Sequence, residues 1–197
     1  MQNHPDVETN MNDVKYHRKA GYRARRKLIG SIPRSRDEVF EKLRELNTET
    51  SRAENFVLHE DIEEGILMFS CATNIRSLIE CNSLYMDGTF DFCTKHFTQL
   101  FVIHGYRRGF YVPLVFCLLP SKQKVIYEKC LKVITAKCAD LTGAPLAPTQ
   151  CVTDFEKAMQ LAVMEVWPTT TLVGCRFHLR QAWYAVISSR FFSHRTF

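Results

Sequence analysis

Three strand-like runs follow one another in the middle of this chain with no helix between them, and this pattern constrains the fold most. The runs cover residues 83–93, 97–107 and 110–119. Helical spacing then begins, and the expected elements alternate as helix 125–141, strand 150–153, helix 155–166, strand 170–175 and helix 178–189. The order βββαβαβα predicts an α/β fold, in which a hairpin meander continues through right-handed crossovers into a mixed sheet with flanking helices.

Two further segments are expected ahead of this core, which occupies residues 83–197. Residues 1–36 are polar and basic and are predicted to be disordered, with Gly21, Gly30 and Pro33 breaking any long helix. Residues 37–82 are predicted to form a pre-domain of helices and short strands. Its first helix has Ser35 as a cap and Glu38 three residues on, as in a capping box. Short strands at 56–58 and 66–69 and a short helix from residue 73 or 74 complete it.

Composition supports a packed core and argues against export or membrane insertion. The chain is 46% hydrophobic and contains 14 Phe residues. Its first thirty residues are polar and charged, which is not typical of a signal peptide. The longest apolar run, 110–120, is shorter than the roughly 20 residues that a bilayer span needs, so no membrane partner is expected. The eight cysteines are therefore interpreted as reduced thiols, and none forms a CxxC pair.

Two aspartates lie at the ends of apolar, strand-like runs. Asp87 follows Leu84-Tyr85-Met86, and Asp154 follows Cys151-Val152-Thr153. Carboxylates in such surroundings are costly unless they are paired or bound to a cation. If the two strands are neighbours, the pair could hold Mg²⁺ or Mn²⁺ in a two-metal site, for which nucleic-acid phosphates are the natural substrate. The alternative is structural, with Asp154 as the N-cap of a helix that begins at Phe155.

Several strings resemble, in register, the transposase domain of Mutator-like elements (MULE) over about residues 83–187. The matching strings are Tyr85-Met86-Asp87-Gly88-Thr89-Phe90, residues 99–104, residues 112–120, the helix bearing Tyr127, Thr153-Asp154-Phe155-Glu156 and residues 174–182. The resemblance implies a ribonuclease H-like fold and a DDE-type site for metal-dependent DNA strand cleavage and transfer. Asp87 would be its first acid and Asp154 its second. It also implies DNA as partner, a homo-oligomer in a full-length form and a nuclear location.

The third acid of that family, a later Glu, has no match in this chain. No Asp or Glu follows Glu165, and both Glu156 and Glu165 precede the last expected strand. The chain is therefore expected to be truncated before the C-terminal part of the fold and to lack strand-transfer activity alone. The alternatives are a domesticated, non-catalytic module that binds DNA or protein, and a fragment that associates through uncovered apolar faces. Near the other end, Asn3-His4-Pro5 resembles the last part of a FLYWCH-type zinc finger, which suggests a remnant.

Cys175 and His178 form a CxxH pair at an expected strand-to-helix junction. In the resembling family this pair is characteristic, so the two residues are candidate zinc ligands. A structural zinc site needs four ligands, and His194 is the one later candidate. The alternative is that Cys175 packs in the core and His178 lies at the end of a helix.

Basic residues provide candidate nucleic-acid contacts in two places. Nine Lys or Arg residues and no acid lie between Lys15 and Arg36. Within this stretch Arg23, Arg25, Arg26 and Lys27 could neutralise phosphates, giving salt-dependent affinity without sequence preference. The same stretch could be a nuclear localisation signal or a solvated linker. Arg176 and Arg180 form a second patch, whereas Trp183 and Tyr184 are expected to be core residues of the last helix.

Overall fold

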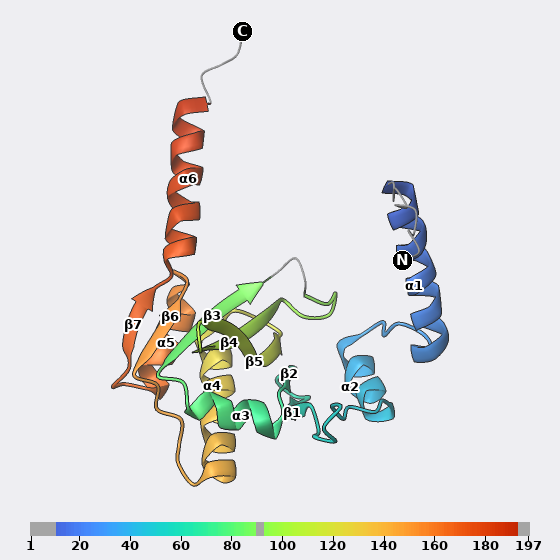
Figure 1. Ribbon diagram of the computed structural model, residues 1–197, viewed down its shortest axis with the longest axis horizontal. Coiled ribbons are helices and arrows are strands. Elements are labelled where there is room, and N and C mark those ends of the chain that lie inside the picture. Colours follow the sequence, from blue (N-terminus) through green and yellow to red (C-terminus); the bar gives the residue numbers. More distant parts are fainter. Residues whose placement is uncertain (1–10, 90–92, 193–197) are drawn as a thin grey trace, which may run out of the picture.

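The computed structural model describes residues 11–89 and 93–192, and within these ranges the strands form one seven-stranded sheet (Figure 1). The strands are β1 (Val57–Asp61), β2 (Ile66–Phe69), β3 (Ser83–Thr89), β4 (Gln99–Arg107), β5 (Phe110–Leu119), β6 (Gln150–Thr153) and β7 (Thr171–Gly174). The helices are α1 (Met11–Ile29), α2 (Arg36–Glu45), α3 (Ala72–Ile79), α4 (Lys124–Thr142), α5 (Lys157–Val166) and α6 (Arg176–Phe192).

The sheet is mixed, as the sequence predicted. Its strand order is β1-β2-β5-β4-β3-β6-β7. The neighbouring pairs β1–β2, β2–β5, β5–β4 and β4–β3 are antiparallel. The pairs β3–β6 and β6–β7 are parallel. The two parallel pairs are possible because α4 and α5 carry the chain back across the sheet before β6 and β7. The α/β class with flanking helices is thereby confirmed, and likeness to ribonuclease H in particular stays a prediction.

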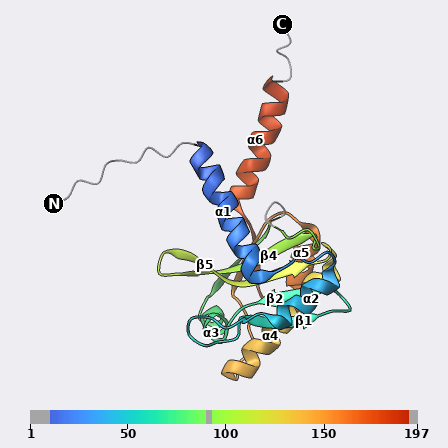
Figure 2. The ribbon, with the colours of Figure 1, turned by 90° about the vertical axis from the view of Figure 1, so that its right-hand side faces the viewer.

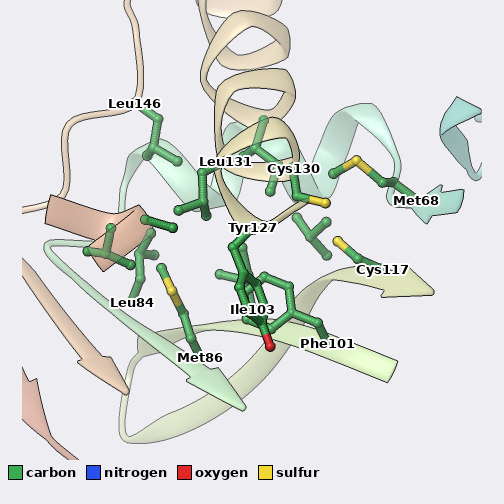
Figure 3. Packing of buried hydrophobic residues seen from close by; sticks show 14 of the residues in the cluster. Met68, Leu84, Met86, Phe101, Ile103, Cys117, Tyr127, Cys130, Leu131 and Leu146 are labelled. Carbon is green, nitrogen blue, oxygen red and sulfur yellow. The ribbon is translucent and has the colours of Figure 1, made fainter. Parts of the chain in front are cut away.

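The main core lies between one face of the sheet and the helices α3, α4 and α5. Alternate residues of β3 and β4 point into it, including Leu84, Met86 and Ile103, and the aromatic ring of Tyr127 enters it from α4 (Figure 3). These side chains are buried, as the period of two in a strand requires when one face is covered. Their neighbours along the same strands consequently point to the opposite face.

A smaller core covers part of that opposite face. The ring of Phe40 in α2 packs with Leu67 of β2, Leu118 of β5 and Phe97. The helix begins as predicted, because the backbone N–H of Glu38 donates to the Ser35 hydroxyl over 3.1 Å. The Glu38 carboxylate in turn accepts from the backbone of Arg34 over 2.7 Å. α2 therefore lies over the β2–β5 part of the sheet.

The predictions for the basic N-terminal segment were partly wrong. Residues 11–29 form a helix with Gly21 inside it, where disorder and a break at Gly21 were expected. A glycine costs a helix interior only about 1 kcal/mol, which the lysines, arginines and alanines around it offset through their high helix propensity. The helix ends instead at Gly30, which has φ +78° and donates its N–H to the Arg26 carbonyl. The FLYWCH resemblance around His4 lies outside the described residues.

The last helix projects from the body of the molecule, as does α1 (Figure 2). Trp183 and Tyr184 are 66% and 74% exposed, so the prediction that they are core residues was wrong. The physical reason is that α6 leaves the sheet after its first turn, and the described part of the chain provides no layer against which its aromatic residues could be buried (Figure 1). No helix in the described ranges is both long and apolar enough to cross a membrane.

Candidate metal and nucleic-acid site

The parallel pairing of β3 with β6 brings the two predicted acids to the same edge of the sheet. Tyr85 is opposite Val152 in the register; Asp87 lies two residues further along β3, and Asp154 is the residue that follows the end of β6. Because the carboxyl ends of neighbouring parallel strands share one edge, Asp87 and Asp154 lie on adjacent chain segments there. The expectation that the two strands are neighbours is thus met.

Asp87 is half-exposed and contacts the first turn of α6. Its side chain is 45% exposed, and its Oδ1 atom lies 3.5 Å from Nε2 of His178. The other ring nitrogen of His178, Nδ1, is buried and has no hydrogen-bond partner among the described residues. The histidine of the CxxH pair therefore lies against the first candidate metal ligand, a contact that the sequence did not predict.

Asp154 stabilises the turn that leads into α5. Its Oδ1 atom accepts a hydrogen bond from the backbone N–H of Glu156 over 3.0 Å, and its carbonyl accepts from the Gln160 side chain over 2.9 Å. The helix begins at Lys157 with Glu156 as its N-cap, so Asp154 is not the cap of a helix beginning at Phe155. Oδ1 already has one donor, and a carboxylate oxygen retains a second lone pair for a cation.

A partly buried set of hydrogen bonds connects this turn to α4 and to the start of β4. The hydroxyl of Tyr127 donates to Oε1 of Glu156 over 2.7 Å and accepts a short hydrogen bond from the side-chain amide of Gln99. Nζ of Lys122 lies 3.5 Å from the other oxygen of Glu156. Gln99 is fully buried, although its own carbonyl oxygen has no partner among the described residues. These hydrogen bonds were not predicted from the sequence. The available signal was Gln99, a polar residue at the start of an apolar strand.

Cys175 lies at the same edge, one residue after β7. Its backbone N–H donates to the Thr153 carbonyl over 2.7 Å, and its carbonyl accepts from Leu179 as the first helical bond of α6. The thiol is free and half-buried. Across residues 11–89 and 93–192, no group of three or more His, Cys, Asp or Glu side chains is arranged to hold a metal ion. Zinc at Cys175 and His178 therefore stays a prediction.

The predicted nucleic-acid contacts lie on the two projecting helices. Arg23, Arg25, Arg26 and Lys27 are all exposed on α1. Arg176 and Arg180 are exposed one turn apart on α6. Pro33, just after α1, accepts a hydrogen bond of 2.8 Å from Nε2 of His96, which precedes β4. This bond ties the segment between α1 and α2 to the loop between β3 and β4.

The fold and the site define an α/β protein with a mixed sheet, one acid on β3, a second acid directly after the neighbouring parallel strand β6, and exposed cations on two helices. The family model of the MULE transposase domain matches residues 83–182, from the start of β3 into α6. The match covers half of the chain, and the chain therefore belongs to the MULE transposase family. No curated protein and no solved structure matches it.

Proposed function

We propose that this chain is a transposase-derived domain whose ancestral function is metal-dependent DNA strand cleavage and transfer of the DDE type, on a ribonuclease H-like core. The observation that carries the proposal is the parallel register of β3 and β6, which puts Asp87 and Asp154 on adjacent segments at one edge. Membership of the MULE family supports DNA as the partner. Asp87 and Asp154 are the proposed first and second acids.

The donor set fits Mg²⁺ or Mn²⁺. Both ions prefer oxygen ligands, and Mg²⁺ commonly takes one or two protein carboxylates, with waters and substrate phosphates completing its shell. Asp87 is exposed enough to reach such an ion, and Asp154 is held in place by the Glu156 backbone. The bound ions would activate water and stabilise the leaving oxygen of a phosphodiester. The residues of this chain would hold the ions and orient the phosphate.

Strand transfer by this polypeptide alone is not expected. No Asp or Glu follows Glu165, so the later Glu that the family resemblance implies as the third acid has no match among these residues. Two carboxylates can still retain a divalent ion, with phosphate oxygens as the remaining ligands. We therefore propose that this chain binds DNA with the help of a metal ion at the edge formed by β3 and β6.

Manganese binding tests the site directly. Mn²⁺ affinity is measured by electron paramagnetic resonance for the full chain, for Asp87→Asn and for Asp154→Asn. We expect either substitution to abolish the tight Mn²⁺ site. Glu165→Gln, which changes an exposed acid at the end of α5, is the matched control and should bind Mn²⁺ normally. Equal Mn²⁺ affinity in all four proteins would overturn the metal site.

A plasmid-nicking assay tests the activity separately. Supercoiled DNA is incubated with the chain and Mg²⁺ or Mn²⁺, and no nicking is expected. Nicking that is lost in both Asp87→Asn and Asp154→Asn would show that two acids suffice. In that case the domain would be an active nuclease as printed.

A second function, a non-catalytic DNA-binding module, is favoured by α1. This helix exposes its lysines and arginines along its length and lies outside the residues that the family model matches. Such a module would bind DNA through phosphate contacts alone. It would bind equally well after Asp87→Asn and Asp154→Asn and without divalent ions. The same basic segment is the proposed nuclear localisation signal.

A further inference from the structure

We propose that Tyr85, Tyr106 and Tyr111 form a stacking platform for the bases of a single nucleic-acid strand, next to Asp87 on the sheet. This inference deepens the proposed function and rests on it, because it names a subsite for the DNA on which the domain would act. Throughout this subsection the three residues are called the tyrosine platform.

The register places the platform on the same face of the sheet as Asp87. Leu84 and Met86 point toward α4, so Tyr85 and Asp87, which alternate with them, point to the opposite face (Figure 3). Tyr85 is paired with His104, and Tyr106 lies two residues further along β4. Tyr111 of β5 is directly opposite Tyr106. Three neighbouring strands thus carry the acid and the rings on one side.

The three rings contact one another, and two of them, Tyr106 and Tyr111, are also exposed to solvent. Tyr85 and Tyr111 meet edge to face, with ring centroids 4.7 Å apart and an interplanar angle of 85°. The centroids of Tyr106 and Tyr111 are 5.0 Å apart. Tyr106 is nevertheless 46% exposed and Tyr111 60% exposed. The cluster is therefore held in place by its own contacts while it presents aromatic surface to a ligand.

The charges around the platform suit a nucleic-acid strand. Arg107 and Arg108 form the adjoining end of the β4–β5 hairpin, where Arg107 pairs with Glu80. Neutral rings beside arginines provide base stacking and phosphate attraction together.

The spacing is suitable for a strand that also reaches the acid. Tyr85 precedes Asp87 by two residues, which corresponds to about 7 Å along a strand. A strand with one phosphate at Asp87 would therefore have an adjoining nucleotide close to Tyr85. α2 lies over the β2–β5 part of this face, at the packing contacts of Phe40, rather than over the tyrosines.

Strand binding in the absence of metal tests the platform. Fluorescence anisotropy of a labelled oligothymidylate is measured with the full chain in EDTA, and for Tyr111→Ala and Tyr106→Ala. Because each base–aromatic stack contributes about 1–3 kcal/mol, each alanine variant should bind about 5- to 150-fold more weakly. Tyr111→Phe, which keeps the ring, is the matched control and should retain most of the affinity. Circular dichroism checks that each variant folds.

The outcomes separate this inference from the proposed function. EDTA removes any contribution of metal at Asp87, so loss of strand binding in the alanine variants supports the platform even if no metal binds. Unchanged affinity for the oligonucleotide in both alanine variants would overturn the platform and would leave the metal site unaffected. Sedimentation analysis tests the alternative that another protein chain, rather than a nucleic-acid strand, covers this face. If Tyr111→Ala alters the molecular mass in solution but not strand binding, the face is an interface between protein chains and the inference fails.

Discussion

The hydroxyl of Tyr127 donates a hydrogen bond of 2.7 Å to Oε1 of Glu156, which connects the middle of the main core to the turn after β6. Glu156 is the residue whose backbone N–H binds the Asp154 carboxylate. Burial is the main reason that the pKa of the Tyr127 hydroxyl lies well above its usual range, and the hydrogen bond to Glu156 raises it further. The hydroxyl thus stays protonated and keeps donating.

Removing this hydroxyl should destabilise the protein. Tyr127→Phe keeps the packed ring but leaves the buried amide of Gln99 without its acceptor. An unsatisfied buried donor costs about 1–3 kcal/mol, so the free energy of unfolding should fall by that amount in urea denaturation. Tyr111→Phe removes the hydroxyl of an exposed tyrosine and should change the free energy of unfolding by less than about 0.5 kcal/mol. Equal effects of the two substitutions would contradict the role of the network.

His104 should make the stability of the fold sensitive to mildly acidic pH. Burial is the main cause that lowers the pKa of its ring below the usual 6.5, although the Tyr85 backbone and Asp87 oppose this shift. The unfolded chain therefore takes up the proton first, and the free energy of unfolding decreases as the pH falls below about 6.5. His104→Gln should flatten this dependence between pH 7 and the lowered pKa. His17→Gln, at an exposed site in α1, controls for the loss of a histidine.

Two glycine substitutions should have opposite effects. A Cβ at Gly105 would lie 2.5 Å from Sγ of Cys81 and 2.9 Å from Leu114, so Gly105→Ala should destabilise the protein by about 1–3 kcal/mol. A Cβ at Gly21 would meet nothing within 4 Å. Gly21→Ala should therefore stabilise α1 by about 0.5–1 kcal/mol and raise its helical circular dichroism signal. An unchanged helical signal together with an unchanged stability of Gly21→Ala would contradict a helix that runs through residue 21.

The cations of α1 should set the salt dependence of duplex binding. Alanine at Arg23, Arg25, Arg26 and Lys27 preserves helix propensity and removes four exposed positive charges. For every DNA phosphate that is no longer neutralised, the slope of log Kobs against log salt should become shallower by about 0.9. Lys132→Ala on α4 controls for the removal of an exposed cation and should leave the slope unchanged. An unchanged slope in the α1 variant would exclude this helix from DNA binding.

Most elements of the sheet could be predicted from the sequence because their signals are local. The strand-like character of the three central runs and the Ser35 cap each depend on a few neighbouring residues, and the structure confirms both. The formation of α1 depends on the balance between one glycine and many residues of high helix propensity. A rule that ends every helix at a glycine predicts this balance wrongly. Trp183 and Tyr184 were misplaced because burial requires a neighbouring layer, and a sequence window does not contain that layer.

In the candidate site, too, the residues with local sequence signals could be predicted, whereas the contacts between distant residues could not. Asp87 and Asp154 could be identified because each follows an apolar run, and parallel pairing of their strands was a consequence of the expected crossover. The contact of His178 with Asp87 and the hydrogen bonds of Tyr127 join residues far apart in the chain. Such contacts depend on helix orientation, which spacing alone does not determine. The tyrosine platform was missed for the same reason, since its rings come from three strands.

The β1–β2 hairpin extends the sheet beyond the part that defines the family. β2 pairs with β5, and its residues Ile66 and Met68 belong to the main core. Both strands of the hairpin nevertheless precede Ser83, the first residue that the family model matches. The residues that the family model matches therefore do not include all residues of the main core. A recombinant fragment that begins at Ser83 would lose these contacts and would expose the edge of β5 at residues 116–118, where an unpaired edge invites intermolecular strand pairing. Expression of the transposase domain from this chain should accordingly begin upstream of β1.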